Sequence, residues 1–130
     1  MKKIKYSWTQ FDRDCKEIAK WAKSHKFANV YGIPRGGLIL AVRLSHLLNI
    51  PLARMPDEVN KDTLVVDDIC DTGATMIKLK DHTLLYNMKT ATLHYCKTSV
   101  YEPTYHCRIK KDWIIYPWES EDSSKYDGTY

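Results

Sequence analysis

The chain has 130 residues, which suffice for one compact domain and are too few for two. A hydrophobic fraction of 44% and a charged fraction of 28% are typical of a globular protein and argue against a disordered chain. No stretch approaches the roughly 20 apolar residues of a membrane span. The net charge of +4 suits an anionic small molecule as well as nucleic acid.

The N-terminus and the cysteines both favour a cytoplasmic protein. Residues 1–8 are basic, but the apolar core of a signal peptide does not follow them. Cys15, Cys70, Cys96 and Cys107 are widely spaced, with no Cys-x-x-Cys pair. Disulfides are the alternative, but nothing else suggests secretion. We therefore expect reduced and mostly buried thiols.

Apolar periodicity and turn residues predict alternating helices and strands. Thr9-x-x-Asp12 resembles a helix-start box, so the first helix is expected from about Thr9 to His25. Two more helices are expected over 38–48 and from 72–75 to about 82. Strands are expected over 28–33, 51–55, 63–66, 90–96 and 112–116. This order predicts a single α/β domain with a mostly parallel twisted sheet flanked by helices over residues 1–119, and a polar, fraying tail over 120–130.

The first expected strand ends in the turn Gly32-Ile33-Pro34-Arg35-Gly36-Gly37, which leads into a helix. Glycines let an anion approach backbone N–H groups, and a helix start carries partial positive charge. Arg35 adds a planar fork of donors. The turn therefore predicts a diphosphate-sized cradle, although a tight turn with a surface arginine is the alternative.

The strand over 63–66 ends in a stronger signal. Asp67 and Asp68 follow it directly, and Asp71-Thr72-Gly73-Ala74-Thr75 opens the next helix. Adjacent carboxylates repel each other, so a cation such as Mg²⁺ or a group of ribose hydroxyls is expected beside them. The helix start offers N–H and hydroxyl groups suited to a monophosphate. The alternative is an acidic loop with a capping threonine. The chain contains neither a Gly-x-x-x-x-Gly-Lys-Ser/Thr loop nor a Gly-x-Gly-x-x-Gly fingerprint.

These residues resemble the type I phosphoribosyltransferases, most closely the bacterial xanthine-guanine type. Residues 65–75 are similar to that family's signature for phosphoribosyl diphosphate (PRPP), and residues 32–37 to its pyrophosphate loop. Residues 113–119, Trp-Ile-Ile-Tyr-Pro-Trp-Glu, resemble its purine-binding hood, which would span about 97–119. Tyr6-Ser7-Trp8 before the first helix is similar as well. The resemblance therefore covers nearly the whole chain up to Glu119.

The resemblance implies a role for each matching residue. Asp67 and Asp68 would hold the ribose hydroxyls and Mg²⁺, and Asp71 would act as general acid/base at purine N7. The 5′-phosphate would contact Asp71, Thr72, Gly73, Ala74 and Thr75. Pyrophosphate would contact Pro34, Arg35 and Gly36, where the family often has a cis peptide. The purine would contact Lys97, Trp113 and Ile114. The implied partners are PRPP, a 6-oxopurine base and further copies of the chain in a dimer or tetramer. Neither a membrane nor nucleic acid is expected as a partner.

The chain departs from that family in one place. Active members carry a long mobile loop before the signature strand, and here only Asp57 to Asp62 is available. Arg54 or Lys61 could supply a second pyrophosphate contact. Two hypotheses follow: a purine phosphoribosyltransferase, or a PRPP- or nucleotide-binding sensor that has lost turnover. An acid/base residue and a base platform favour the enzyme, because a phosphate sensor needs neither.

Overall fold

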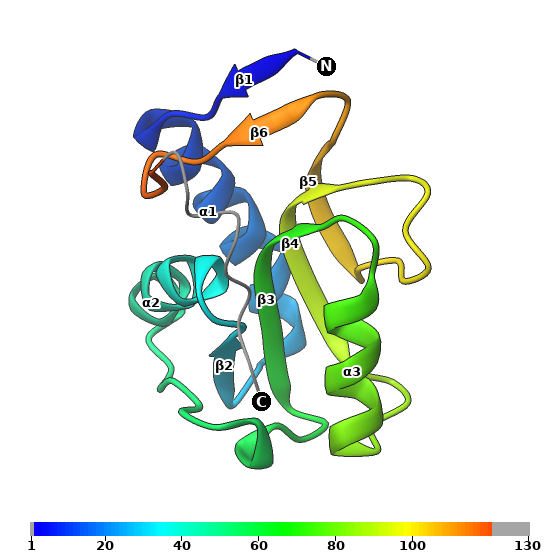
Figure 1. The fold of residues 1–130 in the computed structure, drawn as a ribbon. Helices are drawn as coiled ribbons and strands as arrows, with labels where there is room; N and C mark the ends of the chain where they lie inside the picture. The colour runs from blue at the N-terminus through cyan, green and yellow to red at the C-terminus, as the bar shows by residue number, and fades with distance from the viewer. Residues whose placement is uncertain (1, 121–130) are drawn as a thin grey trace.

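The structure is a computed structural model, and it describes residues 2–120. Figure 1 shows how the elements follow one another along the chain. In chain order they are β1 (Lys3–Lys5), α1 (Trp8–Ala22), the 3-10 turn η1 (Lys23–His25), β2 (Asn29–Gly32), α2 (Gly36–Leu48), the 3-10 turn η2 (Pro56–Glu58), β3 (Thr63–Cys70), α3 (Ala74–Thr83), β4 (Lys89–Tyr95), β5 (Tyr105–Ile109) and β6 (Trp113–Ile115). The predicted tail, residues 120–130, lies outside the described residues except for Ser120.

The central sheet has the strand order β2-β3-β4-β5, and every neighbouring pair is parallel. Helices α1 and α2 lie on one face and α3 lies on the other (Figure 1). Strands β1 and β6 form a separate parallel pair beyond the carboxyl ends of the sheet. The predicted α/β fold with a mostly parallel sheet is confirmed.

The side chains of β3 explain why it lies inside the sheet. Leu64 and Val66 pack into the core cluster shared with α1 and α2, and Val65 packs into the cluster on the α3 side. All three are fully buried. Alternate residues of a strand point to opposite faces, so an unbroken apolar run is what a strand covered on both faces requires. The sheet places the strand's polar end, Asp67–Asp68, next to the end of β2.

The first helix begins earlier than the sequence predicts. Ser7 is its N-cap and shares a capping box with Gln10, so the predicted box of Thr9 and Asp12 is wrong. Asp12 instead pairs with Lys16 and Arg43 on the surface.

The strand expected over 51–55 is wrong: it is reduced to one bridge, between Leu52 and Val30. The Glu58 carboxylate accepts the N–H groups of Arg54 and Met55, at 2.6 and 3.1 Å, and so withdraws them from the sheet. This contact folds the chain into η2 and back to β3.

Two strands, β1 and β5, were not predicted. Strand β5 nevertheless carries a readable signal, because Tyr105, Cys107 and Ile109 alternate with two polar residues. Strand β1 has only three residues, all exposed, and exists through its pairing with β6.

All four cysteines are free, as predicted. Cys15 and Cys70 are buried, whereas Cys96 and Cys107 are half-buried. None of the helices within residues 2–120 combines the length and the apolar character needed to cross a membrane.

Candidate active site

A cleft of about 500 Å³ opens at the carboxyl end of the central sheet. Loops beyond strand ends form such clefts in parallel α/β sheets. Eleven of the thirteen predicted site residues line it, and only Ala74 and Lys97 do not. The eleven are Pro34, Arg35, Gly36, Asp67, Asp68, Asp71, Thr72, Gly73, Thr75, Trp113 and Ile114.

The loop between β2 and α2 forms one wall. Its Pro34–Arg35 peptide is cis, as the resemblance implies, and Arg35 caps the N-terminus of α2. A Cβ atom on Gly36 would overlap the Asp68 carboxylate, and one on Gly37 would lie 2.6 Å from the Val66 carbonyl oxygen. Both glycines therefore permit the loop to lie directly against β3. The result is a positively charged helix start beside the acid pair.

Asp67 and Asp68, near the carboxyl end of β3, line the cleft. The Asp68 N–H donates to Asp67 Oδ1 at 2.9 Å, and the Ile69 N–H donates to Asp68 Oδ1 at 2.8 Å. Burial raises the pKa of Asp68 to about 6, and the negative charge of Glu119 adds to the increase. Within residues 2–120, no lysine or arginine forms an ion pair with Asp68. Asp68 is therefore a half-buried acid beside two other acids, with no ion-paired lysine or arginine within residues 2–120, and such a group suits a hard cation bound through oxygen.

The turn from Asp71 to Ala74 starts α3 and forms the opposite wall. Gly73 has φ +88°, a left-handed conformation, and a Cβ there would lie 2.7 Å from the Tyr101 backbone nitrogen. The Thr72 hydroxyl accepts the Ala74 N–H at 3.2 Å, and the Thr72 carbonyl accepts the Val100 N–H at 2.9 Å. Ala74 therefore contributes its backbone to a helix start whose hydroxyl groups, from Thr72 and Thr75, face the cleft.

The third wall joins Asp71 to an aromatic surface. Lys110, directly after β5, contacts both carboxylate oxygens of Asp71 at 3.0 and 3.1 Å, and its ammonium lies 5.5 Å from the centre of the Trp113 ring. Lys97 is exposed on the turn after β4 and lies outside the cleft. The sequence reasoning missed Lys110 because it missed β5. Had that strand been predicted, a lysine at its carboxyl end would have been a candidate.

The hood is fastened to β3 through Tyr116. Its hydroxyl donates to the Asp68 carbonyl at 3.2 Å, and His94 Nδ1 lies 2.8 Å from the same hydroxyl. Since the tyrosine hydrogen is used, the imidazole must donate from Nδ1. Burial lowers the pKa of His94 to about 4, so the ring is neutral near pH 7. Trp118 stacks on Tyr116 with 5.0 Å between ring centres, and the Tyr116 N–H donates to Glu119.

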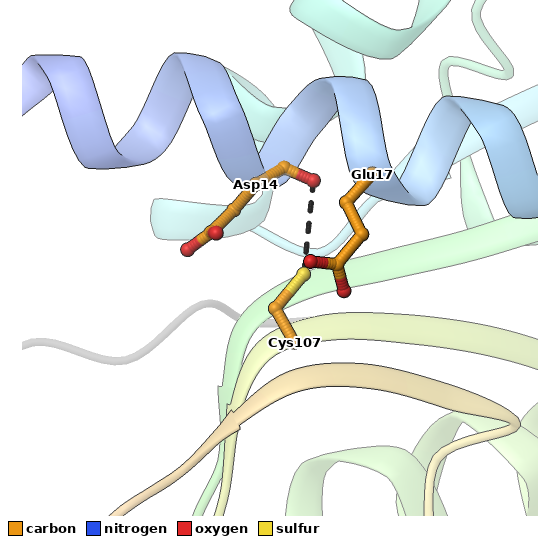
Figure 2. A group of neighbouring side chains, drawn as sticks. All are labelled: Asp14, Glu17 and Cys107. Carbon is orange, nitrogen blue, oxygen red and sulfur yellow. Dashed lines mark hydrogen bonds between the residues drawn. The ribbon is translucent and has the colours of Figure 1, made fainter.

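A second network fixes β5, and with it Lys110, to α1. The buried carboxylate of Asp14 accepts two bonds from Arg108, at 2.7 and 3.2 Å, and one from the Tyr6 hydroxyl. Figure 2 shows Asp14 and Glu17 on α1 beside Cys107 on β5. Within residues 2–120, this is the one group of three or more His, Cys or acidic residues whose ligand atoms lie close enough together to hold a metal ion. Arg108 already neutralises Asp14, and none of the three residues lines the cleft.

The connection that replaces the family's long loop lies away from the cleft. It ends at Asp62, whose carbonyl accepts the Ala28 N–H at the amino end of the sheet. His82 of α3 holds it there by contacting Asp57 at 3.1 Å. Arg54 and Lys61 belong to this connection, and neither lines the cleft.

Known proteins are similar to this chain in sequence and in structure. Residues 53–124 match the phosphoribosyl transferase domain family. A xanthine-guanine phosphoribosyltransferase of Idiomarina loihiensis is 30% identical, over 87% of this chain and 84% of that protein. A purine phosphoribosyltransferase from Pyrococcus horikoshii Ot3 has a similar structure, with a TM-score of 0.82 and 29% identity over 92% of this chain and 96% of that one. A xanthine-guanine-hypoxanthine phosphoribosyltransferase of Helicobacter pylori gives a TM-score of 0.76 at 21% identity over 90% and 92% of the two chains.

Proposed function

This chain belongs to the phosphoribosyl transferase family, and from that premise we propose that it transfers the 5-phosphoribosyl group of PRPP to a 6-oxopurine. One observation carries the proposal. The acid pair Asp67–Asp68 and the two glycine turns line the same cleft as Asp71 and Trp113, and Lys110 contacts both of these residues. A phosphate-binding protein would need the first half only.

In this proposal, PRPP occupies the half formed by β2, β3 and α3. The start of α3, with Thr72 and Thr75, binds the 5′-phosphate, and the start of α2, with Arg35, binds pyrophosphate. Asp68, supported by Asp67, binds the ribose hydroxyls. These three positions lie on neighbouring strand ends, which agrees with a substrate that carries anionic groups at both ends of a ribose.

The purine occupies the other half. Trp113, a residue that is 41% exposed, provides a stacking surface, and the Ile114 backbone lies beside it on β6. The oxygen at purine C6 is the predicted target of Lys97, and that contact stays a prediction because Lys97 lies outside the cleft in this structure. Guanine, xanthine and hypoxanthine all carry that oxygen and are the proposed bases.

The reaction then needs little covalent assistance from the protein. The bond from C1′ to pyrophosphate breaks through a positively charged, oxocarbenium-like C1′, and purine N9 forms the new bond. Arg35 stabilises the negative charge on the departing pyrophosphate. Asp71 accepts the proton that purine N7 gives up as N9 attacks C1′. Fixing the two substrates against each other provides most of the remaining acceleration.

The acid pair fits a magnesium ion. Asp67 and Asp68 would hold it, because both residues line the cleft and Asp68 has no ion-paired lysine or arginine within residues 2–120. A bound Mg²⁺ would orient the ribose hydroxyls and reduce the repulsion between pyrophosphate and the acids.

Pyrophosphate release tests the proposal. The protein is mixed with PRPP and Mg²⁺, and release is measured with guanine, xanthine, hypoxanthine, adenine or no base. We expect release that depends on a 6-oxopurine, with adenine close to the background without base. No release with any of the three 6-oxopurines, while calorimetry shows that PRPP binds, would refute the proposal.

The same assay separates the alternative, a sensor without turnover. The short connection from Asp57 to Asp62, which does not line the cleft, favours it, because a closing loop normally excludes water from the reacting C1′. A sensor would bind PRPP or a purine nucleotide tightly and release no pyrophosphate with any base.

A further inference from the structure

We propose that Lys110 is the positioning residue for Asp71: it fixes the carboxylate in the orientation needed at the purine. The inference rests on the proposed function and concerns a residue outside every motif used to predict the site. It begins from the only ion pair within residues 2–120 that joins two cleft residues.

The contact is well defined at both ends. The Lys110 ammonium reaches both oxygens of Asp71, at 3.0 and 3.1 Å, so it restricts rotation of the carboxylate as well as its position. The Lys110 side chain is only 13% exposed, whereas that of Asp71 is 45% exposed. Without Lys110, the acid would be free to turn toward water. With Lys110 present, the more exposed Asp71 side chain is held by the more buried Lys110 side chain.

Lys110 is itself held from two directions. Its N–H donates to the Tyr95 carbonyl at 2.8 Å, which fixes the backbone against β4 where the sheet ends. Its ammonium lies 5.5 Å from the centre of the Trp113 ring, within the range of a cation–π contact. Lys111, the next residue, is exposed instead and lies outside the cleft.

These contacts place one ammonium between the proton carrier and the proposed stacking surface. A purine on Trp113 would meet the Asp71 carboxylate with its N7 edge only if that carboxylate is held in one orientation, and the contact of Lys110 to both carboxylate oxygens restricts it to one. Lys110 also places a positive charge beside the Asp71 carboxylate, 3.0 Å from its Oδ1 atom. Lys97 cannot act in this way from the exposed turn that it occupies.

The prediction is tested by a double-mutant cycle between the two residues. Lys110→Met removes the charge and keeps the length, Lys110→Arg keeps the charge, and Lys111→Met is the matched control. For each, kcat and both KM values are measured with PRPP and guanine, in the wild-type and Asp71→Asn backgrounds. Unfolding transitions confirm that each variant is folded, and Lys110→Gln replaces Lys110→Met if the latter is not.

We expect Lys110→Met to lower kcat about tenfold or more while the KM for PRPP stays within about twofold. In the Asp71→Asn background the same change should alter kcat less than about twofold, because residues that act as one unit are not additive. Lys110→Arg should recover part of the loss, and Lys111→Met should resemble the wild type.

Three results would overturn the inference: an equal loss in both backgrounds, a higher guanine KM with unchanged kcat, or no effect. A wild-type protein that releases no pyrophosphate would refute the proposed function instead. In that case crystal structures still decide the Lys110 inference. An Asp71 side chain that keeps its orientation in Lys110→Met contradicts it, and one that turns toward solvent supports it.

Discussion

The two halves of the cleft are built in different ways. The PRPP half consists of the acid pair on β3 and of two turns that follow the neighbouring parallel strands β2 and β3, each a short stretch of adjacent residues. The purine half consists of the ends of β5 and β6, which side chains from β4, α1 and the N-terminus hold in place. The first half therefore depends on local backbone geometry, and the second on long-range polar contacts. A substitution in one half should leave the other largely intact.

Removing the charge that supports β5 should have the largest effect. Arg108→Met leaves the buried carboxylate of Asp14 without its cation, and we expect the free energy of unfolding to fall by about 3 kcal/mol. Arg43→Met is the matched control, because it breaks a similar double contact, to Asp12, on the surface and should destabilise the protein far less. Chemical denaturation measures both. Equal losses would show that the Asp14 network is not what fastens the purine half.

Distorting a turn should disable the PRPP half. Gly73→Ala places a Cβ 2.7 Å from the Tyr101 nitrogen at φ +88°, so the start of α3 must shift. Calorimetry should show PRPP affinity falling on the order of 100-fold, about 2.7 kcal/mol. The KM for the purine, measured at saturating PRPP, should change little. A variant with unchanged PRPP affinity would show that this turn does not bind the 5′-phosphate.

Acidification should weaken the PRPP half through Asp68. Burial raises its pKa to about 6, and the bound ion requires the charged form, so affinity for PRPP with Mg²⁺ should fall as the pH decreases through 6. Because pH 5 lies about one unit below this pKa, only about a tenth of Asp68 is ionised there. We therefore expect the affinity for PRPP to be about tenfold lower at pH 5 than at pH 7.5. The contribution of Asp68 to folding changes in the opposite direction. Between pH 6 and 3.8 the folded state binds this proton more tightly than the unfolded chain, so the free energy of unfolding rises as the pH falls.

The control for that titration is the variant Asp68→Asn. It has no carboxyl group at this position, so the remaining pH dependence of binding comes from protonation of PRPP itself. Its affinity should be lower throughout and should depend less steeply on pH. Parallel curves for the two proteins would mean that Asp68 does not titrate in the binding range.

Shortening the aromatic surface should have the smallest effect. Trp113→Leu removes the stacking surface from a partly exposed position, and we expect the KM for guanine to rise about fivefold with the KM for PRPP unchanged. Trp8→Leu is the comparison, because Trp8 is 55% exposed and lies outside the cleft. Steady-state kinetics distinguish the two, and an equal rise in both KM values would contradict separate halves.

The difference between the halves also explains what the sequence could predict. The acid pair, the glycine turn and the turn that starts α3 are each a short stretch of adjacent residues that a sequence pattern can identify. The structure places residues of all three on the cleft. Lys110 was missed because its position depends on β5, a five-residue strand whose residues are all half-buried. Its pairing with Asp71 joins residues 39 positions apart, which no local pattern encodes. The strand expected at 51–55 was wrong for a similar reason, since the Glu58 side chain claims two of its N–H groups.

The most direct test of the central claim is the fate of the phosphoribosyl group when both substrates are bound. The protein is incubated with Mg²⁺, PRPP and radiolabelled guanine, and nucleoside monophosphate, ribose 5-phosphate and pyrophosphate are separated by chromatography. If the two halves present PRPP and purine to each other, nucleoside monophosphate and pyrophosphate should form in a 1:1 ratio. Pyrophosphate accompanied by ribose 5-phosphate and no nucleotide would contradict the account, because water rather than purine would then be the acceptor.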